Sequence, residues 1–426
     1  MTETAITSET TRLRAAKTPQ CPYPRLVTGE PAAWNATAAF RALREKGPVQ
    51  PVVLPGELPG WLVTGAVEAR QALTDTRLAH DMRRLPDPRQ GFGGRRLPDD
   101  IFSAEGRHLL NSDSDDHRRL RAVLAPLLSR EATLRWKPYI EGTCAELLDA
   151  MAASREADLL ADYARPLAGR VTAAMLGIPA ERVDELSRLT RAMLGAPDPD
   201  HPSTQRDRAA LFRLWARILG HKRRAPEDDV LTHLSTAHQQ GRLSTQELTS
   251  VAWGLFSGGI SPATTLIAGG AMELLRTPRL RDAWEDQVGA GRLTEELLRL
   301  TSPFPVAVWR FALTEMSIGD TVIPQGAVVL VSLAAANRDP EQFAEPDTVS
   351  LVLEQRHLAF GYGPHYCPGA HLARLQARVA LTALFTRFPR LRLAVAESEL
   401  RWRGVLVERC YERLPVHIGP AEKVTG

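Results

Sequence analysis

The sequence has few cysteines, few lysines and little net charge, and each shortage excludes a class of protein. Its 426 residues contain four cysteines, at positions 21, 144, 367 and 410, without CxxC spacing, so a disulfide framework is not expected. The 53 basic and 50 acidic side chains leave a formal charge of +3, which argues against a nucleic-acid partner bound through bulk charge. Only five of the basic residues are lysine, and the excess of arginine favours bidentate contacts with carboxylates.

Long hydrophobic runs are also missing. The longest apolar stretch, residues 326–336, is well short of the roughly 18 residues that a membrane span needs, and no signal-peptide pattern opens the chain. With 44% apolar and 24% charged residues, the composition is ordinary for a soluble globular protein. We therefore expect no membrane span and a reduced, cytoplasmic location.

The chain is expected to form one large domain behind a short leader. Residues 1–20 are Thr, Ala and Arg without hydrophobic periodicity, which predicts a flexible N-terminal leader. The usual domain size of roughly 150 residues would suggest about three domains. No low-complexity linker divides residues 21–426, however, so these residues are predicted to share one core.

Hydrophobic periodicity predicts a mainly α fold with a minor β part. Apolar faces at helical spacing recur over residues 34–46, 140–152, 182–193, 204–219, 245–275 and 294–300. The segment from Thr245 is long and apolar enough to be a central helix buried on most sides. Runs at 49–54 and 60–64, separated by Pro55-Gly56, predict a hairpin, and strand signals return at 311–323 and 327–331.

The most informative segment surrounds Cys367 and reads FGYGPHYCPGA from Phe360 to Ala370. Its glycines and prolines predict a tight loop whose backbone can lie close to a flat or bulky group. A helix predicted over residues 370–388 directs its positive end at Cys367, which lowers a thiol pKa and favours a thiolate. A single cysteine cannot build a structural zinc site, but it can serve as the axial ligand of a heme iron.

This segment resembles the heme-binding loop of the cytochrome P-450 family, Phe-x-x-Gly-x-x-x-Cys-x-Gly with a basic residue two before the cysteine. Every position is filled, by Phe360, Gly363, His365, Cys367 and Gly369. The resemblance implies heme b as the cofactor and Cys367 as the ligand of its iron. It also implies further heme contacts by Phe360, Gly361, His365 and Gly369.

Further motifs extend the resemblance along the chain. His117 and Arg121 match the family's His-x-x-x-Arg pair, and Arg310 precedes a strand, all three at positions where the family binds the heme propionates. Glu296 and Arg299, three residues apart on one helical face, match its Glu-x-x-Arg pair. The resemblance implies a single large cytochrome P-450 fold, with the heme between the long central helix and the cysteine loop.

The segment before the cysteine loop departs from the family pattern. Residues 336–340, with Phe343 and Pro346, are similar to the meander of bacterial members. The arginine that often follows the last Pro-Asp of this meander is missing here. Arg338 is therefore predicted to be the additional partner of the Glu296–Arg299 pair.

The central helix departs from the family pattern at the residues that deliver protons in other members. Most members carry Ala/Gly-Gly-x-Asp/Glu-Thr, whose acid and alcohol relay protons to dioxygen at the iron. Here Ser261 stands in the place of the acid and Pro262 in the place of the threonine, and with Gly258 and Gly259 they are the candidate catalytic residues. Proline also deprives a carbonyl one turn earlier of its helix donor.

Two interpretations of this departure stay open. In one, the groove is merely shaped this way and the Ser261 hydroxyl bonds to the helix backbone. In the other, protons are delivered through Ser261, ordered water or a substrate hydroxyl.

The resemblance implies a monooxygenase that acts on a small apolar or aromatic substrate of the natural-product type. Loss of the acid–threonine pair favours oxidative coupling or another atypical oxidation. A peroxide-using peroxygenase ranks below this, because Ser261 offers no charge for a substrate carboxylate. A redox-independent isomerase or dehydratase on the same fold is another alternative, and a heme sensor or carrier ranks last.

Family correspondence also implies a pocket and a partner surface. The pocket is expected from residues 86–100, 191–208, 258–262 and 305–308, closed by the tail at 404–407. Arg374 and Arg378, with Arg118 and Arg119, predict either a solvated face or a docking patch for an acidic electron donor. The implied donor is a ferredoxin-type protein with its reductase.

Overall fold

The computed structural model describes residues 41–54, 58–87, 107–194, 201–284, 287–351, 356–405 and 408–419. Helices make up 57% of the structure and strands 12%, which confirms the predicted mainly α class. The leader, residues 34–40, the Pro55-Gly56 turn and most of 86–100 lie outside the described residues, as do 195–200 and 406–407 of the predicted pocket. Residues 41–44 are helical and match the end of the first predicted helix.

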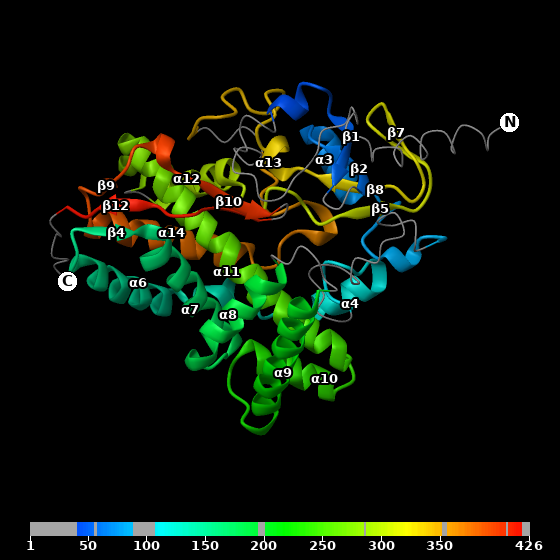
Figure 1. Cartoon of the computed structure of the whole chain (residues 1–426), viewed down its shortest axis with the longest axis horizontal. Coiled ribbons are helices and arrows are strands. Elements are labelled where there is room, and N and C mark those ends of the chain that lie inside the picture. Colours follow the sequence, from blue (N-terminus) through cyan, green and yellow to red (C-terminus); the bar gives the residue numbers. More distant parts are fainter. Residues whose placement is uncertain are drawn as a thin grey trace.

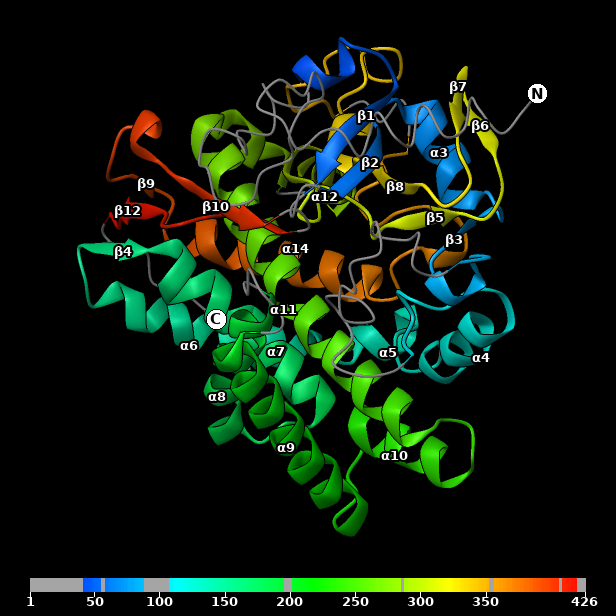
Figure 2. The same cartoon turned by 45° about the vertical axis from the view of Figure 1, so that its right-hand side comes forward.

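The helical part of the molecule is built around α11 (Thr245–Arg276), which crosses its centre in both views (Figures 1 and 2). A capping box starts the helix, since Ser244 accepts from the Glu247 N–H and Glu247 accepts from the Ser244 N–H. α11 packs against α7 (Arg165–Leu176), α12 (Gln287–Thr301) and α14 (Ala370–Arg387), so the predicted central helix is confirmed.

In the described part of the chain, α11 alone is long and apolar enough to cross a membrane by length and composition. Of its qualifying window, 56% is buried inside the fold. This burial is that of a core helix, because neighbouring helices cover the apolar side chains.

The remaining helices surround this core. Each predicted helix from residue 140 to residue 300 lies inside an observed helix, which is longer because its polar ends carry no periodic signal. Their bounds are α3 (Ala66–Thr74), α4 (Ser114–Leu124), α5 (Arg130–Leu134), α6 (Lys137–Ala152), α8 (Ala180–Leu194), α9 (Pro202–Arg224), α10 (Val230–Gln239) and α13 (Leu333–Ala336). A π-helical turn, Leu159–Ala164, leads into α7, and 3₁₀ turns occur at Met82–Arg84, Pro278–Trp284, Gly363–His365 and Glu397–Glu399.

A five-stranded sheet lies at the other end of the molecule (Figure 1), in the order β1-β2-β8-β5-β3. Its strands are β1 (Val49–Leu54), β2 (Leu58–Val63), β3 (Leu78–Ala79), β5 (Arg310–Ala312) and β8 (Val328–Val331). β1 and β2 pair antiparallel with Val49 opposite Val63, which confirms the predicted hairpin. β2 and β8 pair in parallel, so the sheet joins segments far apart in the sequence.

The predicted strand at 311–323 is divided into β5, β6 (Met316–Ile318) and β7 (Thr321–Ile323). Gly319, at φ +53°, forms the turn between β6 and β7. A three-stranded sheet has the order β4 (Glu156–Asp158), β12 (Pro415–His417), β9 (Arg392–Leu393). A separate two-stranded sheet pairs β10 (Trp402–Val405) with β11 (Glu408–Tyr411). The sequence analysis missed β4, because three residues, Glu-Ala-Asp, carry no strand signal and become a strand only by pairing with β12.

The Glu296–Arg299 pair is buried and ties α12 to the meander. Arg299 donates through Nε and Nη2 to the Glu296 carboxylate, both at 2.9 Å. Its remaining bonds, at 3.0, 2.7 and 2.7 Å, go to the carbonyls of Asn337, Pro346 and Thr348. The prediction that Arg338 completes the pair is wrong, since Arg338 pairs with Asp347 at 3.3 Å. The Ser350 N–H donates to the Glu296 carboxylate at 2.9 Å and supplies a donor in place of the missing arginine.

Candidate heme site

Cys367 lies in a tight loop between the meander and α14. Its N–H donates to the Phe360 carbonyl at 2.9 Å, which closes the loop. Gly361 and Gly363 have φ values of +73° and +74°, and a Cβ on Gly363 would come within 2.7 Å of the Thr74 side chain. Glycine is required at these turns, so the loop has the tight backbone that its composition predicted.

The Cys367 thiol lies just before the N-terminus of α14. Burial raises the pKa of Cys367, although the Gly369 N–H and the charges of Arg121 and Arg374 act in the opposite direction. The prediction that the helix end lowers this pKa is therefore wrong, because burial outweighs the Gly369 N–H at the start of the helix and the two arginine charges. A coordinated metal ion deprotonates such a thiol, so a thiolate here depends on the metal.

Three imidazole rings gather beside the cysteine loop. The centroid of the His365 ring lies 4.0 Å from that of His117 on α4 and 3.9 Å from that of His80, which follows β3. Within the described ranges, His117 Nε2 and His80 Nδ1 are buried without a hydrogen-bond partner. Arg310, the first residue of β5, is 2% exposed and donates to the Val308 carbonyl at 2.9 Å.

The electrostatics of this cluster favour an anion. Burial, followed by the effects of His117 and Arg310, lowers the pKa of His365 to about 2. Burial also lowers the pKa of Arg310 to about 10. The nearby Asp113 carboxylate is already engaged, because it accepts from the backbone N–H groups of His80 and Asp81 at 2.9–3.0 Å.

The residues of this site fit a heme. His117 Nε2, which is buried without a partner, and the Arg310 guanidinium, which binds one carbonyl and has further N–H donors, suit the two carboxylates of heme. Cys367 provides the sulfur that a heme iron takes as an axial ligand. The predicted contacts His117, His365 and Arg310 are thus brought together by three separate elements.

Arg121 lies one turn after His117 but binds a different group. Its Nη1 donates to the Tyr366 carbonyl at 2.6 Å, directly beside Cys367. In this structure it therefore supports the backbone of the cysteine loop. Phe360 lies under the Arg374 guanidinium, whose carbon is 4.6 Å from the ring centroid, so a second cation covers the same loop.

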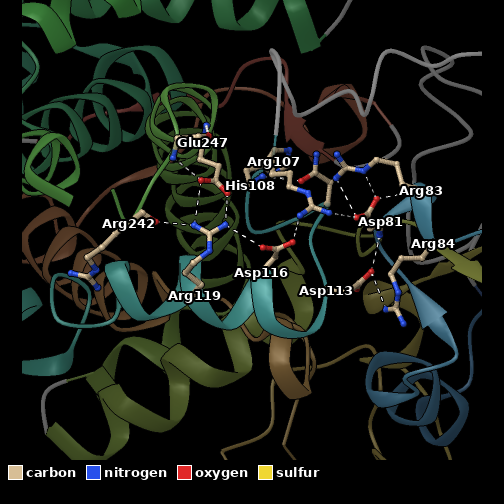
Figure 3. Close-up of polar contacts among 12 residues, drawn as sticks. Asp81, Arg83, Arg84, Arg107, His108, Asp113, Asp116, Arg119, Arg242 and Glu247 are labelled. Carbon is tan, nitrogen blue, oxygen red and sulfur yellow. Dashed lines mark hydrogen bonds and ion pairs between the residues drawn. The ribbon is translucent and has the colours of Figure 1, made fainter. Parts of the chain in front are cut away.

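A chain of ion pairs holds α4, the helix of the predicted propionate ligands, in place (Figure 3). Arg119 donates to Glu247 at the start of α11 at 2.5 Å and reaches Asp116 at 3.2 Å. Asp116 pairs with Arg107, which pairs in turn with Asp81 at 2.8 Å. These ion pairs connect α4 to α11 and to the loop after β3, and so fix α4 from both sides.

The two glycines of the predicted catalytic segment have different surroundings. A Cβ on Gly258 would meet nothing within 4 Å, whereas a Cβ on Gly259 would come within 2.8 Å of Thr172 on α7. Gly258 therefore leaves open space beside α11, and Gly259 allows α7 and α11 to pack closely.

Ser261 carries a free hydroxyl, as it forms no hydrogen bond with any residue that the structure describes. The neighbouring alcohols are engaged: Thr264 donates to the Ile260 carbonyl at 2.9 Å and Thr265 to the Arg409 carbonyl at 2.7 Å. Pro262 lies inside the helix and has no N–H, so the Gly258 carbonyl lacks its donor one turn later. The backbone bond to Ser261 that one interpretation assumed is not formed.

The predicted docking patch is partly neutralised. Arg119 pairs with Glu247, and Arg374 binds Glu295 through two bonds of 2.7 Å. Arg118 pairs with Asp115 at the surface. A groove of about 180 Å³ beside the patch is formed by α5, α12 and α14, and its lining includes Arg130, His371, Arg374 and Arg378.

His80 is a member of the imidazole cluster that the sequence analysis missed. No motif marks it, because it follows a strand of only two residues. The pairing of Leu78 with Ala312 across β3 and β5 brings it close to Arg310. An isolated histidine of this kind is recognised only when the pairing of the strands is known.

Comparisons with known proteins identify the family. The cytochrome P-450 family model matches residues 292–393. The 6-deoxyerythronolide B hydroxylase of Saccharopolyspora erythraea is 36% identical over 397 residues, which cover 90% of this chain and 96% of that protein. The vitamin D(3) 25-hydroxylase of Pseudonocardia autotrophica is 33% identical over 397 residues, which cover 91% of this chain and 94% of that protein. The solved structure of the tirandamycin C-bound monooxygenase TamI has 35% identity and a TM-score of 0.83, covering 92% of this chain and 100% of that chain.

Fold and site together define a heme-dependent oxidoreductase of mainly α architecture. The chain belongs to the cytochrome P-450 family, and it is a monooxygenase with heme b as its cofactor.

Proposed function

We propose that the chain oxidises a small apolar or aromatic natural product, with Cys367 as the axial ligand of the heme iron. The similarity to a 6-deoxyerythronolide B hydroxylase and to a tirandamycin C-bound monooxygenase supports this substrate class. Val306, Ala307 and Val308 are buried apolar residues of a segment predicted to line the pocket, which suits an apolar ligand.

In this proposal the protein holds the cofactor from two sides. His117, His365 and Arg310 bind the propionates, while Arg121 and the Cys367–Phe360 backbone bond hold the loop that presents the sulfur. The bound heme supplies the redox and oxygen-activating chemistry, and thiolate ligation favours cleavage of the O–O bond. The surrounding residues orient the substrate, exclude water and deliver protons.

The cysteine assignment is tested by Cys367→Ala, with Cys410→Ala as the matched control. We expect Cys367→Ala to lose the thiolate-type band of the reduced carbon monoxide complex, and Cys410→Ala to keep it, because one sulfur ligates the iron. A normal thiolate-type band in Cys367→Ala would show that another group binds the metal.

We further propose that Ser261 delivers protons in place of the usual acid and threonine, which supports an atypical oxidation. The observation that carries this step is the free hydroxyl of Ser261, which contrasts with the engaged hydroxyls of Thr264 and Thr265 further along the helix. A hydroxyl can accept a proton from water and pass one on, and the free Gly258 carbonyl can hold that water. Proton transfer by a positioned group typically contributes about 100- to 10,000-fold to a rate.

Ser261→Ala tests this relay, with Thr264→Val as the control. Turnover would be followed with 6-deoxyerythronolide B or tirandamycin C, whichever shifts the heme spectrum on binding. We expect Ser261→Ala to release a larger share of its electrons as peroxide, because the proton arrives late, while Thr264→Val keeps the wild-type coupling. Unchanged coupling in Ser261→Ala would favour a substrate hydroxyl or water as the donor.

We also propose a ferredoxin-type electron donor with its reductase, which docks at the groove between α5 and α14. The groove lies beside the helix that follows Cys367, and Arg130 and Arg378 on its lining form no ion pair with the described residues. Opposite charges speed such encounters at low salt. A cytoplasmic location fits this donor, and the division into a leader at 1–20 and a domain at 21–426 remains a prediction.

A further inference from the structure

A row of arginines follows the outer face of α9. Arg206, Arg213, Arg217 and Arg224, here called the arginine row, are all exposed and lie seven, four and seven residues apart. At 3.6 residues per turn and 1.5 Å per residue, they fall within about 40° of one another and extend over about 27 Å. Trp215 lies on the opposite, buried face of the helix.

The charge of this row is not balanced by the fold. None of the four arginines forms an ion pair with a residue in the described ranges. α9 contains one acidic residue, Asp207, which pairs with Arg188 of α8 at 3.8 Å. Arginines that stabilise this fold behave differently, as Arg119 and Arg374 each bind a glutamate. The row therefore creates a one-signed potential on the surface.

The side chains around the row favour a protein partner over a lipid surface. Ala209, Ala210 and Ala216 flank it, and large exposed hydrophobic residues of the described chain lie on other elements. A helix that lies in a membrane interface needs such apolar anchors. Small neighbours instead allow a second helix to approach closely.

The position of α9 separates this surface from the groove assigned to the electron donor. α9 packs on α8, α10 and α11, and Figures 1 and 2 show it at the edge of the molecule. The groove is formed by α5, α12 and α14 instead. Because α9 packs on α11, the helix of Ser261, a partner bound to α9 lies next to the substrate-side helix.

We propose that an acidic helical protein docks along the arginine row and presents the substrate to the enzyme. One helix of the partner places carboxylates opposite Arg206, Arg213, Arg217 and Arg224. The role in substrate delivery rests on the proposed function, whereas the docking itself does not.

The test measures binding of a bacterial acyl carrier protein, a small acidic helical probe, to the heme-loaded enzyme by fluorescence anisotropy at low and high salt. The double variant Arg213→Glu/Arg217→Glu is compared with Arg279→Glu/Arg392→Glu, which makes the same charge change at exposed arginines on other elements. We expect wild-type binding to weaken with salt, the row variant to lose about tenfold or more in affinity, and the control to match the wild type.

Several results would overturn the proposal. These are no binding of the carrier protein, equal loss in both variants, or binding of phosphatidylglycerol vesicles through the row in place of the carrier protein. Turnover of a free substrate separates this proposal from the proposed function, because the row variant keeps that turnover if only docking is lost. Heme content and circular dichroism confirm that each variant is folded.

Discussion

Arg299→Lys probes how the meander is attached to the helical core. The Arg299 guanidinium makes five hydrogen bonds, two to Glu296 and three to meander carbonyls, and the residue is 1% exposed. A lysine ammonium has three donors, so at least two buried acceptors lose their bond. Each unsatisfied acceptor costs about 1–3 kcal/mol, so we expect a loss of about 2–6 kcal/mol in the free energy of unfolding.

Urea titrations of the heme-loaded enzyme, followed by circular dichroism and heme absorbance, measure this loss. Total stabilities of about 5–15 kcal/mol make even the lower value visible as a shifted midpoint. Arg118→Lys is the matched control, because Arg118 pairs with Asp115 at the surface, and we expect a change within about 0.5 kcal/mol. Equal midpoints for the two lysine variants would refute the reasoning that carbonyls of the meander depend on the guanidinium.

Two further predictions concern α11 and the surface below the cysteine loop. Gly258→Ala should be tolerated and stabilise α11 by up to about 1 kcal/mol while narrowing the open space beside it, whereas Gly259→Ala should destabilise through its clash with Thr172. Thermal unfolding checks this pair, and failure of Thr172→Ala to rescue Gly259→Ala would contradict the clash. Although burial acts to raise it, the bonds from Arg374 and then His357 lower the pKa of Glu295 to about 2. Its ionised form therefore contributes stability above the unfolded pKa of about 4.3, and this is lost as the pH falls toward 2. Glu295→Gln should be less stable than the wild type at neutral pH, with a difference that shrinks between about pH 4 and pH 2, and a constant difference in urea midpoints would contradict this.

The helices were predictable because their signals are local. Apolar residues at helical spacing over residues 245–275 and the Ser244–Glu247 capping pair lie within one continuous segment. β4 was not predictable, because its three residues become a strand only through pairing with β12 at the other end of the chain. The prediction of Arg338 as a partner of Arg299 was wrong for a related reason. Backbone carbonyls carry no sequence signature, and the fold of the meander decides which of them point at the guanidinium.

By itself, the sequence determined the tight loop around Cys367, the central helix and the family to which both point. These are properties of consecutive residues, such as glycines at positive φ and a periodic apolar face. Only the tertiary structure decided that His80 joins His117 and His365, that burial raises the pKa of Cys367, and that Ser261 keeps a free hydroxyl. Each of these depends on atoms from other elements, because desolvation and hydrogen bonding are set by whichever segments the fold brings into contact.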